Sequence, residues 1–232
     1  MTTTTDKSKT CLMCTNKSRC FKKLNTEELE SINAYRAEIH YRKGEMMAKQ
    51  GIFYTHVLYI QNGLVKVYRE MPDGSNIILN FFTEGGLLGL PFLFENVALD
   101  YSVSAIEDTV ICAIDRQHFE QMIQNNGDFA VSLVKELNHC ALYSYDRIIG
   151  LNYKQINGRF ADTLLYLSQK IYCKNDFTLT LSRKDLAEYT GVSVMSIIRV
   201  IKEFKKDGII NIQGNHMEII KPEMLIQISK TG

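Results

Sequence analysis

The chain has 232 residues, of which 45% are hydrophobic and 23% are charged, and its formal net charge is +1. This length corresponds to one large domain or two small ones, and the composition is that of an ordinary globular protein. Only 3 prolines and 14 glycines occur, which excludes long low-complexity stretches. No apolar run is long enough for a transmembrane helix, and the start, MTTTTDKSKT, lacks the apolar core of a signal peptide. We therefore expect a protein of the cytoplasm with no membrane partner.

The charge is unevenly distributed along the chain. Residues 1–149 contain 15 Lys or Arg against 18 Asp or Glu, whereas residues 150–232 contain 12 against 8. The first part is therefore acidic and the last part is basic. A basic segment at the end of the chain indicates a module that binds a polyanion.

The cysteines form a second pattern. The chain contains Cys11, Cys14, Cys20, Cys112, Cys140 and Cys173. The first three fall within the ten residues CLMCTNKSRC. In a reducing cytoplasm, clustered cysteines are typical of metal ligands or redox thiols rather than disulfides. We therefore expect a metal or redox site in a short N-terminal segment, residues 1–24.

A short helix followed by many strands is predicted next. Asn25 and Glu28 fit an N-cap and an acidic third helical position. Short alternating or apolar runs then recur, separated by turn residues: HVLYIQ, LVKVYRE, NIILNFF, YSVSAI and TVICAI. The sequence PDGSN at 72–76 is a hairpin signal. Many short strands are typical of a sandwich or barrel, which we expect over residues 25–114.

From Asp115 the pattern changes to that of a long helix, residues 115–149. Small and apolar residues recur along it at intervals of three and four: Ala130, Leu133, Leu137, Cys140 and Ser144. Val131, Val134 and Leu142 cover another side. A helix that is apolar on two sides packs against two bodies, which we interpret as its own β domain and the helix of a second copy. The alternative is a helix buried within a monomer.

The C-terminal segment, residues 150–232, carries the signals of a helix-turn-helix. A helix is expected near residues 154–172, followed by a short strand at TLTL. Ser182 and Asp185 resemble a capping box, which begins the next helix.

The next signals in the same segment complete this motif. A tight turn is expected at Gly191, and Ser193 can cap a second helix that runs to about Lys206. The β-type runs IINI and MEII flank Gly214 and Asn215, a hairpin signal. Helix, turn, helix and hairpin in this order predict a winged helix-turn-helix.

The second helix of this motif has the properties of a helix that reads DNA. Ile197 and Val200 are apolar where the helix faces its core, and polar or basic residues remain for the outer face. A helix fits the major groove, where Arg199 can donate two hydrogen bonds to guanine, and hydroxyls and lysines suit phosphate. The residues predicted to contact DNA are Ser193, Met195, Ser196, Arg199, Lys202, Lys205 and Lys206. The alternative is a winged helix that binds protein.

Three stretches carry a resemblance to a known family: HVLYIQNGLVKVY, AIEDTVICAIDRQHFEQMI and LSRKDLAEYTGVSVMSIIRVIKEFKKDGII. They resemble the Crp/Fnr superfamily of bacterial transcription regulators over nearly the whole chain. The resemblance implies an α+β fold with a cyclic-nucleotide-binding-like β-roll, a long dimerisation helix and a C-terminal winged helix-turn-helix. It also implies a homodimer that binds a palindromic operator in double-stranded DNA and contacts RNA polymerase. We expect the dimer seam at Leu133, Leu137, Cys140 and Ser144.

The resemblance also bears on the ligand of the β-roll. In members that bind cyclic AMP, a glutamate in a G-E motif holds the ribose hydroxyl, and the arginine of an Arg-Ser pair neutralises the phosphate. Leu90 and Tyr101 stand at these two places. A pocket without a cation holds a phosphodiester anion poorly, so we expect no binding of cyclic AMP or cyclic GMP.

The cysteines favour the oxygen-sensing Fnr branch, whose members bind an iron–sulfur cluster through N-terminal cysteines and one cysteine in the last strand of the β-roll. The spacing Cys-x2-Cys-x5-Cys and the cysteine in EDTVICAID resemble that arrangement. The resemblance implies that Cys11, Cys14, Cys20 and Cys112 hold a [4Fe-4S] cluster. The other two cysteines are interpreted as structural. Zinc or redox thiols at the same cysteines, a haem or nitric-oxide sensor, and another small-molecule effector remain alternatives.

Other function classes fit the sequence less well. The five histidines show no close spacing with carboxylates or a serine, and no phosphate loop or dinucleotide fingerprint occurs, so we expect no enzyme. An interaction module that does not bind DNA would leave the basic helix without a purpose.

Met195 and Ile198 stand where well-known members carry a glutamate and, in Fnr, a serine. The operator sequence is therefore not predicted.

Overall fold

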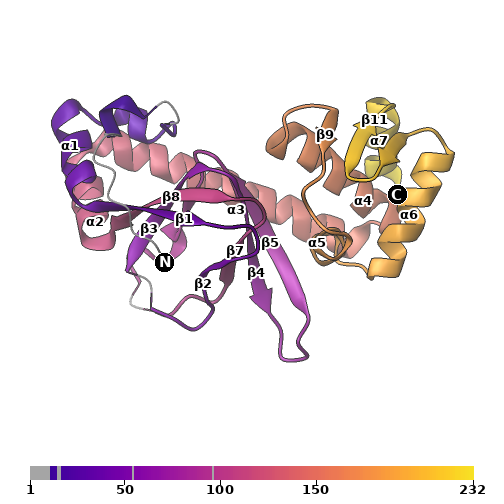
Figure 1. The fold of residues 1–232 in the computed structure, drawn as a ribbon, viewed down its shortest axis with the longest axis horizontal. Coiled ribbons are helices and arrows are strands. Elements are labelled where there is room, and N and C mark those ends of the chain that lie inside the picture. Colours follow the sequence, from indigo (N-terminus) through magenta and orange to yellow (C-terminus); the bar gives the residue numbers. More distant parts are fainter. Residues whose placement is uncertain (1–10, 15–16, 54, 96) are drawn as a thin grey trace. The chain divides into compact units, whose positions relative to one another are not determined.

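The computed structural model describes residues 11–14, 17–53, 55–95 and 97–232. Residues 1–10 of the predicted N-terminal segment lie outside the described residues. The chain forms two compact units: residues up to Arg69 with Phe81–Leu142, and Glu70–Asn80 with Tyr143–Gly232. The long helix α3 (Gly127–Tyr153) begins in unit 1 and ends in unit 2 (Figure 1). No helix within the described residues is long and apolar enough to cross a bilayer.

Two four-stranded sheets form the β domain. The first has the order β1 (Arg36–Tyr41), β8 (Thr109–Asp115), β3 (His56–Asn62) and β6 (Leu87–Leu88). The second has the order β2 (Met46–Ala48), β7 (Ser102–Ala105), β4 (Leu64–Glu70) and β5 (Asn76–Thr83). All five runs predicted as strands form strands, and β4 and β5 are neighbours joined through the predicted turn. In that turn the Asp73 carboxylate accepts a hydrogen bond from the Ser75 amide at 2.9 Å.

Short helices cover one edge of this domain. The predicted capping box starts α1 (Thr26–Ala34), because the Asn25 side chain accepts from the Glu28 amide at 2.9 Å and the Glu28 carboxylate accepts from the Asn25 amide at 2.8 Å. Helices α1 and α2 (Arg116–Asn125) lie side by side (Figure 1). Short 3-10 turns occur at Cys11–Met13, Phe21–Lys23 and Leu90–Phe92.

The helix predicted from Asp115 is interrupted, which corrects the expectation of one continuous helix. Asn126 has an extended backbone and separates α2 from α3. Its side-chain oxygen accepts a hydrogen bond from the Phe129 amide at 2.9 Å, so it acts as the cap of α3. The α3 helix then runs to Tyr153, beyond the predicted end.

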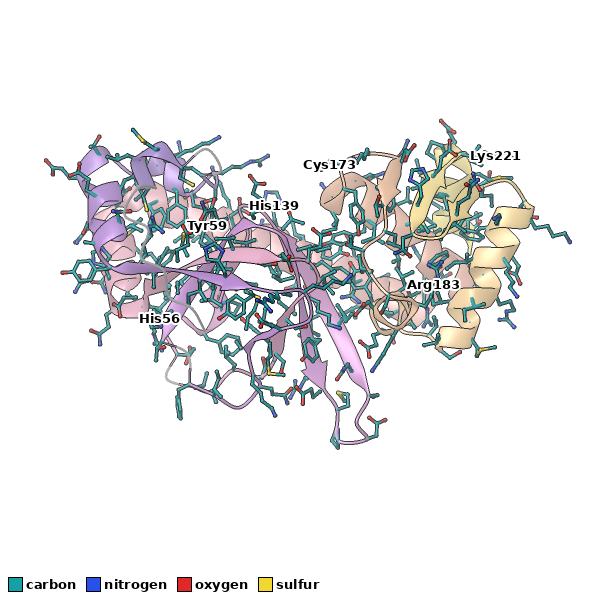
Figure 2. All side chains as sticks on the ribbon, viewed as in Figure 1. His56, Tyr59, His139, Cys173, Arg183 and Lys221 are labelled. Carbon is teal, nitrogen blue, oxygen red and sulfur yellow. The ribbon has the colours of Figure 1, made fainter. Side chains whose placement is uncertain are left out.

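The core of unit 1 is formed by apolar residues of the β strands and extends to where the N-terminal segment, α2 and α3 meet. The aromatic rings of Phe21, Phe119 and Phe129 pack together with centroid distances of 5.5 to 6.4 Å. Tyr59 of β3, labelled in Figure 2, adds an edge-to-face contact to Phe21 at 5.0 Å. Such aromatic packing stabilises the fold beyond the area that it buries.

Unit 2 contains the predicted winged helix-turn-helix. Its helices are α4 (Ile156–Tyr166), extended by a π-helical turn (Leu167–Ile171), α5 (Arg183–Thr190), α6 (Val194–Lys206) and α7 (Pro222–Thr231). Its sheet has the order β10 (Ile210–Gln213), β11 (His216–Ile219) and β9 (Asp176–Thr178). The capping box at Ser182, the left-handed turn at Gly191 and the cap at Ser193 are confirmed. Helix α7 was not predicted, although proline at a first helical position is a known start signal.

The end of α3 is anchored within unit 2. The Tyr143 ring stacks on Tyr166 at 4.8 Å, and its hydroxyl hydrogen-bonds that of Tyr189 in α5. Arg147 lies over the Tyr189 ring at 4.1 Å and donates to the Tyr189 carbonyl at 2.7 Å. These contacts hold the last turns of α3 against α5 within unit 2.

Candidate functional sites

Three of the four predicted ligand cysteines line one cavity in unit 1. Its volume is about 500 Å³, and Cys11, Cys14 and Cys112 lie in its wall. Cys11 belongs to the first 3-10 turn, whereas Cys112 lies in β8 directly opposite Glu38 of β1 and Tyr59 of β3. The fold therefore brings together thiols that lie about a hundred positions apart in the sequence.

Cys20 lies elsewhere. Its side chain is 0% exposed and belongs to the unit 1 core, and it is not among the cavity-lining residues that the structure describes. Burial raises the pKa of the Cys20 thiol, and a hydrogen bond with the Ser132 side chain of α3 opposes that shift. In the described part of the chain, no three His, Cys, Asp or Glu side chains are arranged to hold a metal ion.

A buried cation accompanies the cavity cysteines. The Arg36 side chain is 10% exposed, and its Nη1 donates to the Cys112 Sγ at 3.3 Å. Burial raises the pKa of Cys112 to about 11 and raises the pKa of Cys11, and Arg36 opposes both shifts.

Sequence reasoning missed Arg36, although a signal was present. Arg36, Glu38 and His40 alternate along β1, so they share one face of the strand, and all three line the cavity. A polar face on a strand next to the strand of Cys112 indicates a cavity with polar groups in its wall rather than a packed core.

Two further residues lie where, by the resemblance, members that bind cyclic AMP carry an acid and an arginine. Leu90 and Tyr101 are both buried, and the Tyr101 ring packs edge-on against Phe92 at 5.3 Å. Burial raises the pKa of Tyr101 to about 12, and a hydrogen bond with the Gly89 backbone opposes that shift. Neither side chain supplies a positive charge.

The predicted dimer seam needs a correction at its first residue. Leu133 is only 4% exposed because it packs into the core of unit 1, so it does not face a partner. Leu137 is 37% exposed, and Cys140 and Ser144 are also exposed. Val134 is 63% exposed, so the outer apolar face of α3 includes this residue of the second predicted stripe.

The remaining cysteine, Cys173, lies in unit 2 between α4 and β9 (Figure 2). It is exposed, and its backbone φ of 54° is in the left-handed region. It belongs to the other unit and is not among the residues that line the cysteine cavity.

The helix-turn-helix positions its outer face by close packing at the turn. Gly191 has a φ of 70°, and a Cβ there would lie 2.8 Å from the Leu151 side chain, so only glycine fits. The Ser193 hydroxyl accepts from the Ser196 amide at 3.1 Å, which fixes the first turn of α6. Both residues lie at the N-terminal end of α6, which is the end that a recognition helix places in the major groove.

The predicted DNA-contacting residues form one face. Those that are exposed are Ser193, Met195, Arg199, Lys202, Lys205 and Lys206, whereas Ser196 is half-buried. The Arg199 side chain is 66% exposed, and its Nε lies 3.9 Å from the Glu203 carboxylate one turn further along α6. The Lys205 Nζ donates to the Ile212 carbonyl at 3.0 Å, so it also ties α6 to the wing.

A groove beside this face contains residues that sequence reasoning missed. Gln155, Asn157 and Arg159 at the start of α4 line it together with residues of α6. Arg159 donates to the Gly191 carbonyl at 3.4 Å and to the Lys154 carbonyl at 2.8 Å, so it supports the turn. The sequence did offer one signal for this groove, because Arg159 falls in the first turn of the helix that precedes the motif.

Comparisons with known proteins agree with this arrangement. Residues 38–126 match the cyclic nucleotide-binding domain, and residues 158–228 match the Crp-like helix-turn-helix domain. The chain is 24% identical over 228 residues to an anaerobic regulatory protein of Aggregatibacter actinomycetemcomitans, covering 96% of this chain and 88% of that protein. It is 24% identical over 211 residues to a fumarate and nitrate reduction regulatory protein of Yersinia pestis, covering 89% and 84%.

Solved structures share the fold. FixK2 of Bradyrhizobium japonicum aligns with a TM-score of 0.78 at 21% identity, covering 85% of this chain and 98% of FixK2. The c-di-GMP responsive regulator CLP of Xanthomonas campestris aligns with a TM-score of 0.71 at 20% identity, covering 84% and 99%. With its β domain followed by a helix-turn-helix of the Crp type, the chain belongs to the Crp/Fnr family of DNA-binding transcription regulators, which are not enzymes.

Proposed function

We propose that this regulator senses oxygen or redox state through an iron–sulfur cluster held by Cys11, Cys14, Cys20 and Cys112. The observation that carries the proposal is the cavity that Cys11, Cys14 and Cys112 line beside a buried arginine. The names of the two sequence relatives, which refer to anaerobic regulation and to fumarate and nitrate reduction, support the same kind of signal.

The four cysteines have the chemistry that an iron–sulfur cluster needs, but one of them would have to move. Iron–sulfur clusters are bound by cysteine thiolates, and three thiols next to a guanidinium provide such ligands. Cys20 would have to leave the core and turn toward the cavity to complete the set. When bound, the cluster would supply a centre whose stability depends on oxygen.

The position of Cys20 suggests how the site would act on the dimer. Cys20 hydrogen-bonds Ser132 of α3, and the next residue, Phe21, stacks on Phe129 of α3 at 6.0 Å. Withdrawing Cys20 from the core would alter these contacts with the long helix. A change of about 1.4 kcal/mol at a dimer seam shifts the dimerisation equilibrium tenfold, so a small repacking is sufficient.

The dimer itself is part of the proposal. We place the seam on the exposed face of α3 with Val134, Leu137, Cys140 and Ser144, and Leu133 is withdrawn from the predicted set. Two copies would present two recognition helices to a palindromic operator about one helical turn apart. As a bacterial transcription regulator, the protein would act in the cytoplasm and contact RNA polymerase.

The same proposal assigns the predicted segments their roles. Residues 1–24 and 25–114 would carry and sense the signal, residues 115–149 would transmit it, and residues 150–232 would bind DNA. We propose that cyclic AMP and cyclic GMP are not the effectors, since Tyr101 and Leu90 offer no cation for the phosphate.

DNA binding with and without oxygen tests the proposal. Protein purified without oxygen would be titrated against a symmetric site selected from random DNA, by fluorescence anisotropy, before and after exposure to air. We expect tight binding by a dimer without oxygen and weaker binding in air. Equal affinity under both conditions, in protein shown to contain no iron, would contradict oxygen sensing and leave the family assignment intact.

A further inference from the structure

We infer that Arg36 is a positioning residue of the cysteine site, whose buried guanidinium offsets the negative charge of the thiolate ligands. Through this charge it would set how firmly the site retains iron and how easily the bound cluster is reduced. The inference rests on the proposed function, because it concerns the cluster proposed for the same cavity.

The geometry ties Arg36 to two of the cysteines. Its Nη1 donates to the Cys112 Sγ at 3.3 Å, and it also hydrogen-bonds the Cys11 side chain. Its Nε donates to the Asn33 side-chain oxygen at 3.2 Å, and the Cys11 amide donates to that same oxygen at 3.2 Å. Asn33 therefore fixes the guanidinium and the Cys11 turn in one arrangement.

Charged neighbours determine how much of the guanidinium charge the cysteines experience. The Glu38 carboxylate is 3.8 Å from the Arg36 Nη1, and its other oxygen is 3.1 Å from the His40 Nε2. Lys17 also lines the cavity. The Arg36 Nη1 lies closer to the Cys112 Sγ than to the Glu38 carboxylate. The thiolates would therefore experience part of the guanidinium charge, and the Glu38 carboxylate would reduce that part.

The chemistry follows from charge and hydrogen bonding. Four thiolates give a [4Fe-4S] centre a net negative charge, which is costly to bury without a cation. Hydrogen bonds to the sulfurs, net charge and solvent exposure set the reduction potential of such clusters. A cation beside Cys112 should therefore strengthen iron retention and raise the potential, because the reduced centre is the more negative one.

Four variants of the full-length protein, loaded with iron without oxygen, test this role. Arg36→Met removes the charge, Arg36→Lys keeps it, and Glu38→Gln removes the opposing carboxylate. Arg42→Met is the matched control, because Arg42 follows the same strand and is exposed. The readouts are the loss of iron to a chelator without oxygen and the reduction potential from anaerobic spectroelectrochemistry, with circular dichroism to compare the folds.

We expect Arg36→Met to weaken iron retention about tenfold, the lower end of the loss when a ligand's outer partner is removed. Its potential should fall, Arg36→Lys should restore part of the potential, Glu38→Gln should raise it, and Arg42→Met should match the wild type. If Arg36→Met does not fold, the rise in potential expected for Glu38→Gln still tests the charge effect.

The results distinguish a failure of the role of Arg36 from a failure of the proposed cluster. Wild-type iron retention and potential in Arg36→Met, or an unchanged potential in Glu38→Gln, would overturn the role of Arg36 while the cluster stands. A wild-type protein that holds no iron at all would overturn the proposed cluster, and the role of Arg36 with it.

Discussion

The helix-turn-helix of unit 2 and the cysteine cavity of unit 1 are built in different ways. In the helix-turn-helix, each structural signal acts over a few residues, such as the capping box from Ser182 to Asp185 and the turn at Gly191. In the cavity, Cys11, Arg36 and Cys112 come from a turn, the start of one strand and the middle of another. The surface proposed to read DNA is therefore specified locally, whereas the site proposed to sense a signal depends on tertiary contacts.

The largest expected effect comes from comparing a buried and an exposed residue of α3, because one substitution should change folding and the other dimerisation. Leu133→Ala should lower the free energy of unfolding by about 2–5 kcal/mol, because it leaves a cavity in the core of unit 1. Val134→Glu should leave folding nearly unchanged, since Val134 is exposed, but should dissociate the dimer because it buries a charge at the seam. Urea unfolding and analytical ultracentrifugation measure the two effects. A dimer that survives Val134→Glu would place the seam on another face.

The next effect tests whether the local motif reads DNA. Arg199→Ala should cost about 1–3 kcal/mol of operator binding and relax the preference at one base in each half-site. Anisotropy titrations on the selected site and on single-base variants would measure both. Intact specific binding would show that another helix carries the recognition.

A smaller effect compares one capping box in each unit. Ser182→Ala and Asn25→Ala should each lower the free energy of unfolding by about 1 kcal/mol, because each removes an N-cap. If the comparison holds, Ser182→Ala should also weaken DNA binding, whereas Asn25→Ala should not. Urea unfolding with DNA titrations of both variants checks this, and the reverse pattern would contradict the division of roles.

The smallest effect concerns the salt dependence of DNA binding. Lys205→Ala should weaken binding to all sequences alike and lower the slope of log affinity against log salt by about 1, if its ammonium contacts a phosphate. The structure offers a second role, the bond from Lys205 to the Ile212 carbonyl. An unchanged salt slope with lower thermal stability would assign Lys205 to the wing alone.

The limits of sequence reasoning follow the same division. The capping boxes, five strands of the β domain and the helix-turn-helix were predicted because their signals are local. The strand expected at TLTL, residues 178–181, forms at Asp176–Thr178 instead. The break at Asn126 was missed even though Asn-Gly is a local signal, because the apolar periodicity continues across it. The burial of Cys20 and the hydrogen bond from Arg36 to Cys112 could not be predicted, since both depend on how distant segments pack.

The iron content of protein purified without oxygen tests the central claim most directly. Wild type and Cys173→Ser should contain about four iron and four sulfide per chain, with the broad visible absorption of a [4Fe-4S] cluster, whereas Cys112→Ser should contain neither. Colourless wild-type protein without iron or sulfide would contradict the claim, and a sharp haem band would replace the cluster with another sensor. Equal iron in wild type and Cys112→Ser would show that the cavity cysteines are not the ligands.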